Sequence, residues 1–149
     1  MRQKNAKRKH FIGVFNPSQP EQEPEAWLPI GKWIAEVTDE SEETTVEEAY
    51  YDGDGTTETT VTGIKMAWAF AGTYDPEDAA QAQIASLKYK TGSERKVWQK
   101  YISSDNKQQY VGVSTVTDIK AGSGAAGDYE EFGCKIAYDS IPKASSPTG

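Results

Sequence analysis

The sequence predicts a mainly β fold: an antiparallel β-sandwich or partly open barrel flanked by one α-helix. Apolar and polar side chains alternate through most of residues 27–141, which is the period-2 pattern of strands. Helical spacing is convincing in one segment, from about residue 76 to 89. Several antiparallel strands with a single helix favour a sheet that closes on itself or packs against that helix.

The composition is that of one acidic domain. A length of 149 residues fits one domain, and 36% hydrophobic content with a mean hydropathy of -0.72 predicts a thin core with arms outside it. The net charge of -7 disfavours a general nucleic-acid binder, which needs a positive surface. We expect one domain over 1–149, with an N-terminal arm over 1–26, a long acidic loop over 38–56 and a C-terminal tail over 142–149.

The N-terminal arm starts basic and continues as a polar linker. Its first ten residues hold five basic side chains and no acid, and residues 11–15 predict one short strand. The basic stretch fits a nucleic-acid or localisation patch, a solvated tail, or an arm that docks on an acidic neighbour. His10 is the single histidine, and we expect it to be solvated. The apolar patch after it is too short for a secretory signal.

Residues 27–37 predict a strand, and an acidic run follows it. Because the like charges from Asp39 to Glu48 repel, we expect a loop that stays extended or mobile until something covers it. The Asp-Gly steps at 52–55 predict a tight turn. A calcium loop that starts at Asp52 is disfavoured because its sixth position, where glycine is needed, is Thr57.

A long strand runs from Thr59 to about Tyr74, with one bulky face and one small face. Both faces are apolar, so we expect both to be covered. The bulky face should form the sandwich core, and the small face should let a helix or a neighbouring strand approach closely. The bulky face holds Met66, Trp68, Phe70 and Tyr74, and the small face holds Ala67, Ala69, Ala71 and Thr73.

The helix is predicted from about Pro76 to Tyr89. Asp75 suits the N-cap position, and proline suits the first helical position. Its apolar stripe of Ala80, Ile84 and Leu87 is narrow, so we expect it to lie close against a sheet or a neighbouring subunit.

Three more strands complete the prediction. Residues 95–102 and 109–119 predict an antiparallel hairpin, and residues 129–141 predict the last long strand. The glycine-rich stretch at 121–128 lacks the Gly-Lys-Ser/Thr ending of a phosphate loop. Cys134 lies in the apolar alternation of the last strand, so we expect a buried, unreactive thiol.

The sequence offers no constellation of catalytic or metal-ligating residues. It has one histidine and one cysteine, and its carboxylates cluster in predicted loops. No run approaches the roughly 18 apolar residues of a membrane-spanning helix. We therefore expect no enzymatic activity, no cofactor and no membrane binding.

Six segments follow one another over residues 27–143, namely WLPIGKWI, AYYDGDGTTETTVTGIK, FAGTYDPEDAAQAQIASLK, TGSERKVW, VSTVTDIKAGSG and YEEFGCKIAYDSIP. This ordered series resembles the major tail proteins of long, flexible-tailed bacteriophages (siphophages) of Gram-positive hosts. The order of the segments, rather than any single motif, carries the resemblance.

The resemblance implies a structural protein of the virion tail, made in the host cytoplasm. Members of this family form hexameric rings that stack into a tail tube, with strands of all six subunits in one barrel. The implied partners are further copies of the chain, the tape-measure protein inside the channel, and the tail terminator and distal tail proteins. DNA would pass through the channel during ejection without specific binding.

Two sets of candidate residues follow from the resemblance. Since a negative channel wall repels phosphate, acids on strands are candidates for the lumen. Shortening residues 40–48 should block tube formation without unfolding the chain, and charge reversal at lumen acids should slow DNA ejection. The interface candidates are Glu40, Glu42, Glu43, Tyr50, Tyr51, Asp52, Asp54, Ala67 and Ala69, and the lumen candidates are Glu36, Glu58, Glu130 and Asp139.

Two alternative functions fit the same sequence. Trp27, Trp33 and Trp98 are available for stacking on sugars, which favours a carbohydrate-binding β-sandwich of a virion or cell surface. A tube protein of a contractile or bacteriocin-like particle is the other alternative.

Overall fold

The computed structural model describes residues 2–49, 51 and 53–146, which form ten strands, one α-helix and two 3-10 turns. The helix is α1 (Ala79–Ala85), and the 3-10 turns are η1 (Asn5–Lys7) and η2 (Gly92–Arg95). The strands are β1 (Lys9–Val14), β2 (Leu28–Ile30), β3 (Ile34–Asp39), β4 (Glu42–Glu48), β5 (Glu58–Lys65), β6 (Ala67–Thr73), β7 (Lys96–Ile102), β8 (Gln109–Ala121), β9 (Glu131–Tyr138) and β10 (Lys143–Ser145).

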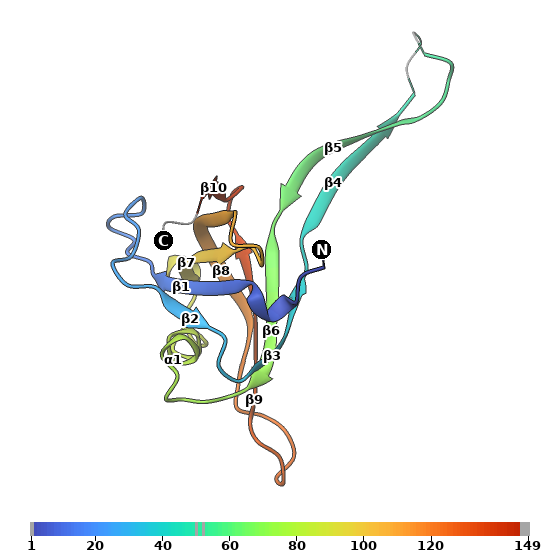
Figure 1. Ribbon diagram of the computed structural model, residues 1–149. Helices are drawn as coiled ribbons and strands as arrows, with labels where there is room; N and C mark the ends of the chain where they lie inside the picture. The colour runs from blue at the N-terminus through green and yellow to red at the C-terminus, as the bar shows by residue number, and fades with distance from the viewer. Residues whose placement is uncertain (1, 50, 52, 147–149) are drawn as a thin grey trace.

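One antiparallel sheet curls into a half-barrel and forms the body of the molecule (Figure 1). Its strand order is β2-β1-β7-β8-β9-β6-β3, with β10 beside β8, and α1 packs against β2 and β8. Strands β4 and β5 pair only with each other and project from the body as a hairpin (Figure 1). The predicted fold class is therefore confirmed.

The core lies inside the curl, and the bulky face of β6 belongs to it. Trp68 and Phe70 pack with Phe132 and Ile136 of β9, while Met66 and Tyr74 flank the cluster half-buried. Helix α1 closes the core with its apolar stripe of Ala80, Ile84 and Leu87.

The small face of β6 looks away from the core, and α1 does not cover it. Ala67 is buried, Ala69 is half-buried and Ala71 is exposed in the single chain. The described part of the single chain leaves the outer end of this face uncovered, so the expectation that both faces are covered stays a prediction for an assembly of several copies.

The predicted acidic loop contains a strand. Residues 42–48 form β4, which pairs with β5 from Glu42↔Lys65 to Glu48↔Glu58. Thr44, Thr45 and Val46 favour extended backbone, and their partner strand is even richer in β-branched residues. The predicted long strand is also divided at Met66, so that β5 belongs to the hairpin and β6 to the main sheet.

The N-terminal arm is part of the sheet rather than a peripheral tail. Strand β1 lies between β2 and β7, which places the predicted short strand inside the sheet. His10 is consequently 5% exposed, and the expectation of a solvated histidine is wrong. Alternation explains the burial, because His10 shares a face with the fully buried Ile12.

The helix is shorter than predicted and starts later. Asp78 is the N-cap, with its side chain accepting a hydrogen bond from the backbone N–H of Gln81. Asp75, the predicted cap, instead accepts from the backbone N–H of Glu77 in the turn before the helix. After Ala85 the chain continues as turns up to Tyr89.

The remaining predicted strands are confirmed. Strands β7 and β8 form the expected antiparallel hairpin, and β9 holds Cys134, whose thiol is 5% exposed. Burial raises the pKa of that thiol to about 12, so it stays protonated at neutral pH. None of the helices within residues 2–49, 51 and 53–146 is long and apolar enough to cross a membrane.

Candidate functional site

The β4–β5 hairpin has both faces in solvent (Figure 1). Every residue of β4 is exposed, and Gly63 alone is half-buried in β5. Val46, Val61 and Ile64 are 42%, 50% and 52% exposed. A lone two-stranded hairpin is marginally stable in water, so a surface that covered this element would stabilise it.

The hairpin region also carries the negative charge of the chain. Residues 39–65 hold nine of the 23 acidic side chains and one of the 16 basic ones. The rest of the chain, with 15 basic and 14 acidic side chains, is nearly neutral. The electrostatic field is therefore strongly polarised between the hairpin and the body.

The two faces of the hairpin differ in chemistry. Cross-strand partners share a face, so the register Glu43↔Ile64 and Thr45↔Val61 defines one of them. This face combines two exposed aliphatic side chains with Glu43 and Glu47 and has no basic residue. The opposite face holds Val46 with acids and with Lys65. We call the first one the aliphatic face.

The predicted interface residues lie at the base, along the length and at the tip of the hairpin, and on β6. Glu42 and Glu43 are on β4, and Glu40 at the base forms an ion pair of 3.7 Å with Lys135. Asp54 accepts from the N–H of Thr56, and the side-chain and backbone hydrogen bonds of Thr56 lower the pKa of this carboxyl. Tyr51 is fully exposed at the tip, whereas Tyr50 and Asp52 lie outside the described residues. Ala67 and Ala69 are on the small face of β6.

The predicted lumen acids are spread over four places. Glu36 shares a face with Ala71 of β6, and Glu58 starts β5. Glu130 precedes β9, and its carbonyl accepts from the N–H of Tyr74. Asp139 follows β9, where Lys96 and Thr115 bind its carboxylate. The structure does not bring these four acids together in one chain.

An open face of the main sheet runs across β3, β6 and β9 on the side away from the core. Its floor is small, with Ala69, Ala71 and Gly133, and a groove of about 520 Å³ lies over it. The groove is also lined by acidic and basic side chains, namely Glu40, Asp118, Lys120, Glu131 and Lys135. Acidic and basic side chains therefore surround a groove whose floor is formed by small residues.

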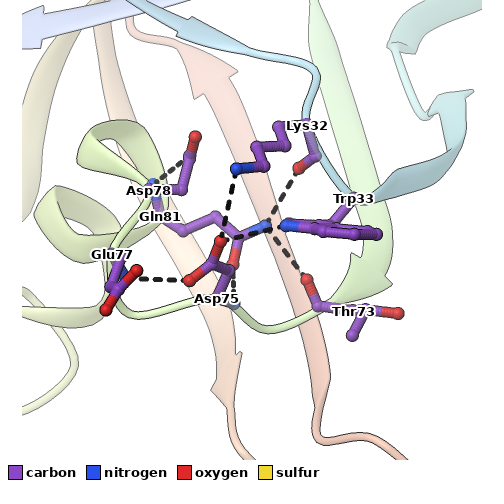
Figure 2. A network of polar contacts seen from close by, with 7 residues as sticks. All are labelled: Lys32, Trp33, Thr73, Asp75, Glu77, Asp78 and Gln81. Atoms are coloured by element: carbon purple, nitrogen blue, oxygen red, sulfur yellow. Dashed lines mark hydrogen bonds and ion pairs between the residues drawn. The ribbon is translucent and has the colours of Figure 1, made fainter.

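A buried glutamine fixes the corner where β2, β3 and β6 meet α1 (Figure 2). Gln81 is 1% exposed, and its Nε2 donates to the carbonyls of Lys32 and Thr73 at 3.3 and 3.1 Å. Its Oε1 accepts from the N–H of Asp75 at 2.7 Å. The Trp33 indole donates to the Asp75 carboxylate at 2.9 Å. One side chain thereby joins the β2–β3 connection at Lys32 to the β6–α1 connection at Thr73 and Asp75.

The same corner holds Trp33 in an unusual conformation. Its φ is 68°, in the left-handed region that non-glycine residues rarely adopt, and its side chain is 55% exposed. The neighbouring strand tolerates this because Gly72 has no side chain: a Cβ there would come within 2.1 Å of the Trp33 carbonyl oxygen. Trp33 can therefore adopt this backbone conformation only because residue 72 is a glycine.

A hollow of about 410 Å³ separates the N-terminal segment from β2 and β3. Its walls include Arg8, His10, Ile30, Ile34, Val37 and one acid, Glu36. His10 Nε2 accepts from Arg8 Nε at 2.9 Å, and the ring meets Trp68, Phe70 and Tyr101. Burial, followed by the Arg8 charge, lowers the pKa of His10 to about 3. His10 is therefore neutral, and its Nδ1 has no partner among the described residues.

Sequence reasoning did not single out Gln81, the Arg8–His10 pair or the hollow. The alternation of His10 with Ile12 was an available signal for a buried histidine. No signal identified Gln81, because a glutamine on a helix is ordinarily a surface residue.

The fold is shared with chains of tail and tube assemblies. The chain matches one from the tail of an empty gene transfer agent (GTA) particle, refined with C6 helical symmetry, at TM-score 0.70, 13% identity, and coverage of 99% of this chain and 100% of that chain. A chain from the virion of a native gene transfer agent matches at TM-score 0.69 and 11% identity. That match covers 97% of this chain and 100% of that chain. A chain from the sheath–tube complex of an extracellular contractile injection system, PVC, matches at TM-score 0.52 and 11% identity. That match covers 93% of this chain and 89% of that chain.

No family model matches the chain, and no curated protein matches it in sequence. At identities of 11–13% the likeness to the solved structures establishes the fold. These matches span nearly the whole of both chains, so they include both the half-barrel and the projecting hairpin.

Proposed function

We propose that this chain is the structural subunit of a viral tail tube. The observation that carries the proposal is the likeness over 99% of the chain to a component of a tail refined with C6 symmetry. The body offers a polymer-forming surface rather than a catalytic centre: an uncovered hairpin, a smooth open face and two sheet edges, β2 and β3.

Six copies form a ring, and rings stack into a tube. A heterologous contact that closes after six steps makes the ring, and a second set of contacts stacks the rings. The hairpin, with its candidate residues Glu42, Glu43 and Asp54, supplies one contact to a neighbouring copy. Closure also covers the sheet edges, whose unpaired N–H and C=O groups otherwise favour aggregation.

The open face of β3, β6 and β9 lines the channel. Ala69, Ala71 and Gly133 give a wall without large side chains, and Glu36 shares that face. Acids outnumber bases along the groove on this face, with Glu40, Asp118 and Glu131 against Lys120 and Lys135, which disfavours adhesion of DNA as it passes. The tape-measure protein occupies the channel before ejection, and terminator and distal tail proteins close the two ends, as in the siphophage tails that the sequence resembles.

A second candidate is the tube of a contractile particle, favoured by the likeness to the PVC sheath–tube complex at TM-score 0.52. Such a tube is enclosed by a sheath. A neighbouring tape-measure gene without a sheath gene supports the flexible tail, and a sheath gene supports the contractile particle. The carbohydrate-binding alternative is weaker, because Trp98 is buried and Lys100 lies 4.7 Å from the ring of the half-buried Trp27.

Electron microscopy of the purified chain tests the proposal. Increasing concentration should produce rings with sixfold class averages, and then tubes of uniform width. Mass photometry should give a species of six subunit masses of 16.4 kDa. A chain that stays monomeric at every concentration and salt condition would contradict the proposal.

A further inference from the structure

We propose that the aliphatic face of the hairpin docks on a second copy of the chain, in the hollow beside the basic N-terminal segment. The basic segment is residues 2–9, and the hollow is the one between that segment, β2 and β3. This inference rests on the proposed tube and specifies which two surfaces of neighbouring copies meet.

The two surfaces are complementary in charge. Residues 2–9 hold five basic side chains and no acid, and residues 2–7 and Lys9 are exposed. No ion pair within 4.0 Å joins Lys4, Lys7 or Lys9 to an acid in the described part of the chain. The aliphatic face carries Glu43 and Glu47, both fully on the solvent side. The hollow wall adds one acid, Glu36, which the five basic side chains outnumber. A copy therefore presents an acidic projection and a net basic receptor on different parts of its surface.

The two surfaces also match in shape and polarity. Ile64 and Val61 are exposed on a projecting element, while the hollow of about 410 Å³ has aliphatic walls at Ile30, Ile34 and Val37. Burying two half-exposed aliphatic side chains removes apolar area from water, which favours docking. The opposite face of the hairpin has one exposed aliphatic side chain and Lys65, so it fits this receptor less well.

Charge exchange between two variants tests the contact. Glu43→Lys with Glu47→Lys reverses the charge of the aliphatic face. Lys4→Glu, Lys7→Glu and Lys9→Glu together leave two basic and three acidic side chains in residues 2–9 and so reverse the receptor. Arg8 is kept because it packs over Trp68. Each variant alone should lose at least tenfold in self-association, measured by sedimentation at low salt. An equimolar mixture should restore association, since every hairpin then meets a receptor of opposite sign.

A matched control changes the same number of charges on the other face of the hairpin. Glu48→Lys with Glu58→Lys, at a cross-strand pair on that other face, should associate as the unchanged chain does. Rescue in one chain carrying all five reversals, without rescue in the mixture, places the contact within a single copy and overturns the inference. Unimpaired association of both variants overturns it as well.

The same measurements separate this inference from the proposed function. If the unchanged chain forms tubes and the charge reversals have no effect on association, the proposed docking contact is contradicted and the proposed tube function is supported. If the unchanged chain forms open oligomers that obey the charge pattern but never rings or tubes, the docking is supported and the tube is contradicted. A chain that never associates contradicts both.

Discussion

At the scale of single residues, the buried histidine links the N-terminal segment to the core. His10 touches Trp68, Phe70 and Tyr101 through its ring and Arg8 through Nε2. A proton on this ring would remove the acceptor of Arg8 and add a cation inside an aromatic cluster. Both effects favour the neutral form, in agreement with the lowered pKa.

The first prediction concerns acid destabilisation by His10. The pKa is about 3 in the folded chain and 6.5 when the ring is solvated, so the unfolded chain binds more protons between these values. The stabilising effect is complete above pH 6.5 and is lost as the pH falls toward 3. At pH 4.5 we expect a loss of about 2–3 kcal/mol in the free energy of unfolding from this group.

Urea unfolding at pH 7 and pH 4.5 measures this effect, with His10→Phe as the comparison. Phenylalanine keeps an aromatic ring in the cluster but takes up no proton, so the variant should lose less stability over that interval. NMR titration of the ring should show no protonation above pH 4.5. A histidine titrating near pH 6 would contradict the buried, neutral ring.

At the scale of elements, the Gln81 corner decides how β3 and α1 are held together. Its amide makes three hydrogen bonds, to Lys32, Thr73 and Asp75, and it is 1% exposed. Gln81→Leu keeps the volume and leaves those backbone groups without partners. We expect a loss of about 2–3 kcal/mol in the free energy of unfolding.

Gln83→Leu is the matched control for Gln81→Leu, measured by the same urea unfolding. Gln83 lies on the same helix, is half-buried, and has no side-chain hydrogen bond among the described residues. Its replacement should change stability by about 0.5 kcal/mol or less, since glutamine and leucine have similar helix propensities. Equal effects of the two substitutions would show that the amide network does not stabilise the corner.

The hairpin is the element where the sequence prediction and the structure differ most. Charge repulsion indicated a loop, but the β-branched residues at 44–46 and 59–62 allow two strands to pair. The positions of Glu43, Glu47, Val61 and Ile64 on one face depend on the register and on the bulge between Thr44 and Thr45. Register is a property of the pair of strands, so neither strand alone reveals it.

The third prediction separates folding from assembly. Replacing residues 45–62 with Asn-Gly joins the paired residues Thr44 and Gly63 by a two-residue turn. The removed part pairs only with itself, so the free energy of unfolding should change little. Ring and tube formation should be lost, because the aliphatic face is shortened. Normal tubes in electron micrographs of this variant would contradict a role for the hairpin in assembly.

At the scale of the whole molecule, alternation and turn signals were enough for the fold class. They located β6, β7, β8 and β9, because each has a clear apolar face. They did not place β1 between β2 and β7, since strand order depends on long-range pairing. The candidate interface was located only as a region: Tyr51, Asp54 and the β4 acids lie on one projecting element, whereas the receptor hollow joins residues 5 to 37 through the fold.

The last prediction concerns the channel formed by the assembled molecule. If the open face lines it, Glu36 faces the passing DNA, and Glu36→Lys places a cation on that wall in every subunit. Purified tubes of this variant should then retain several-fold more short duplex DNA in nuclease-protected form at low salt. Glu77→Lys adds the same charge beside α1, away from the open face, and should leave the protected fraction unchanged. The excess should disappear at high salt because phosphate contacts are screened. Equal protection in the Glu36→Lys and unchanged tubes would place the open face outside the channel, and the same substitution should then leave the rate of DNA ejection unaltered.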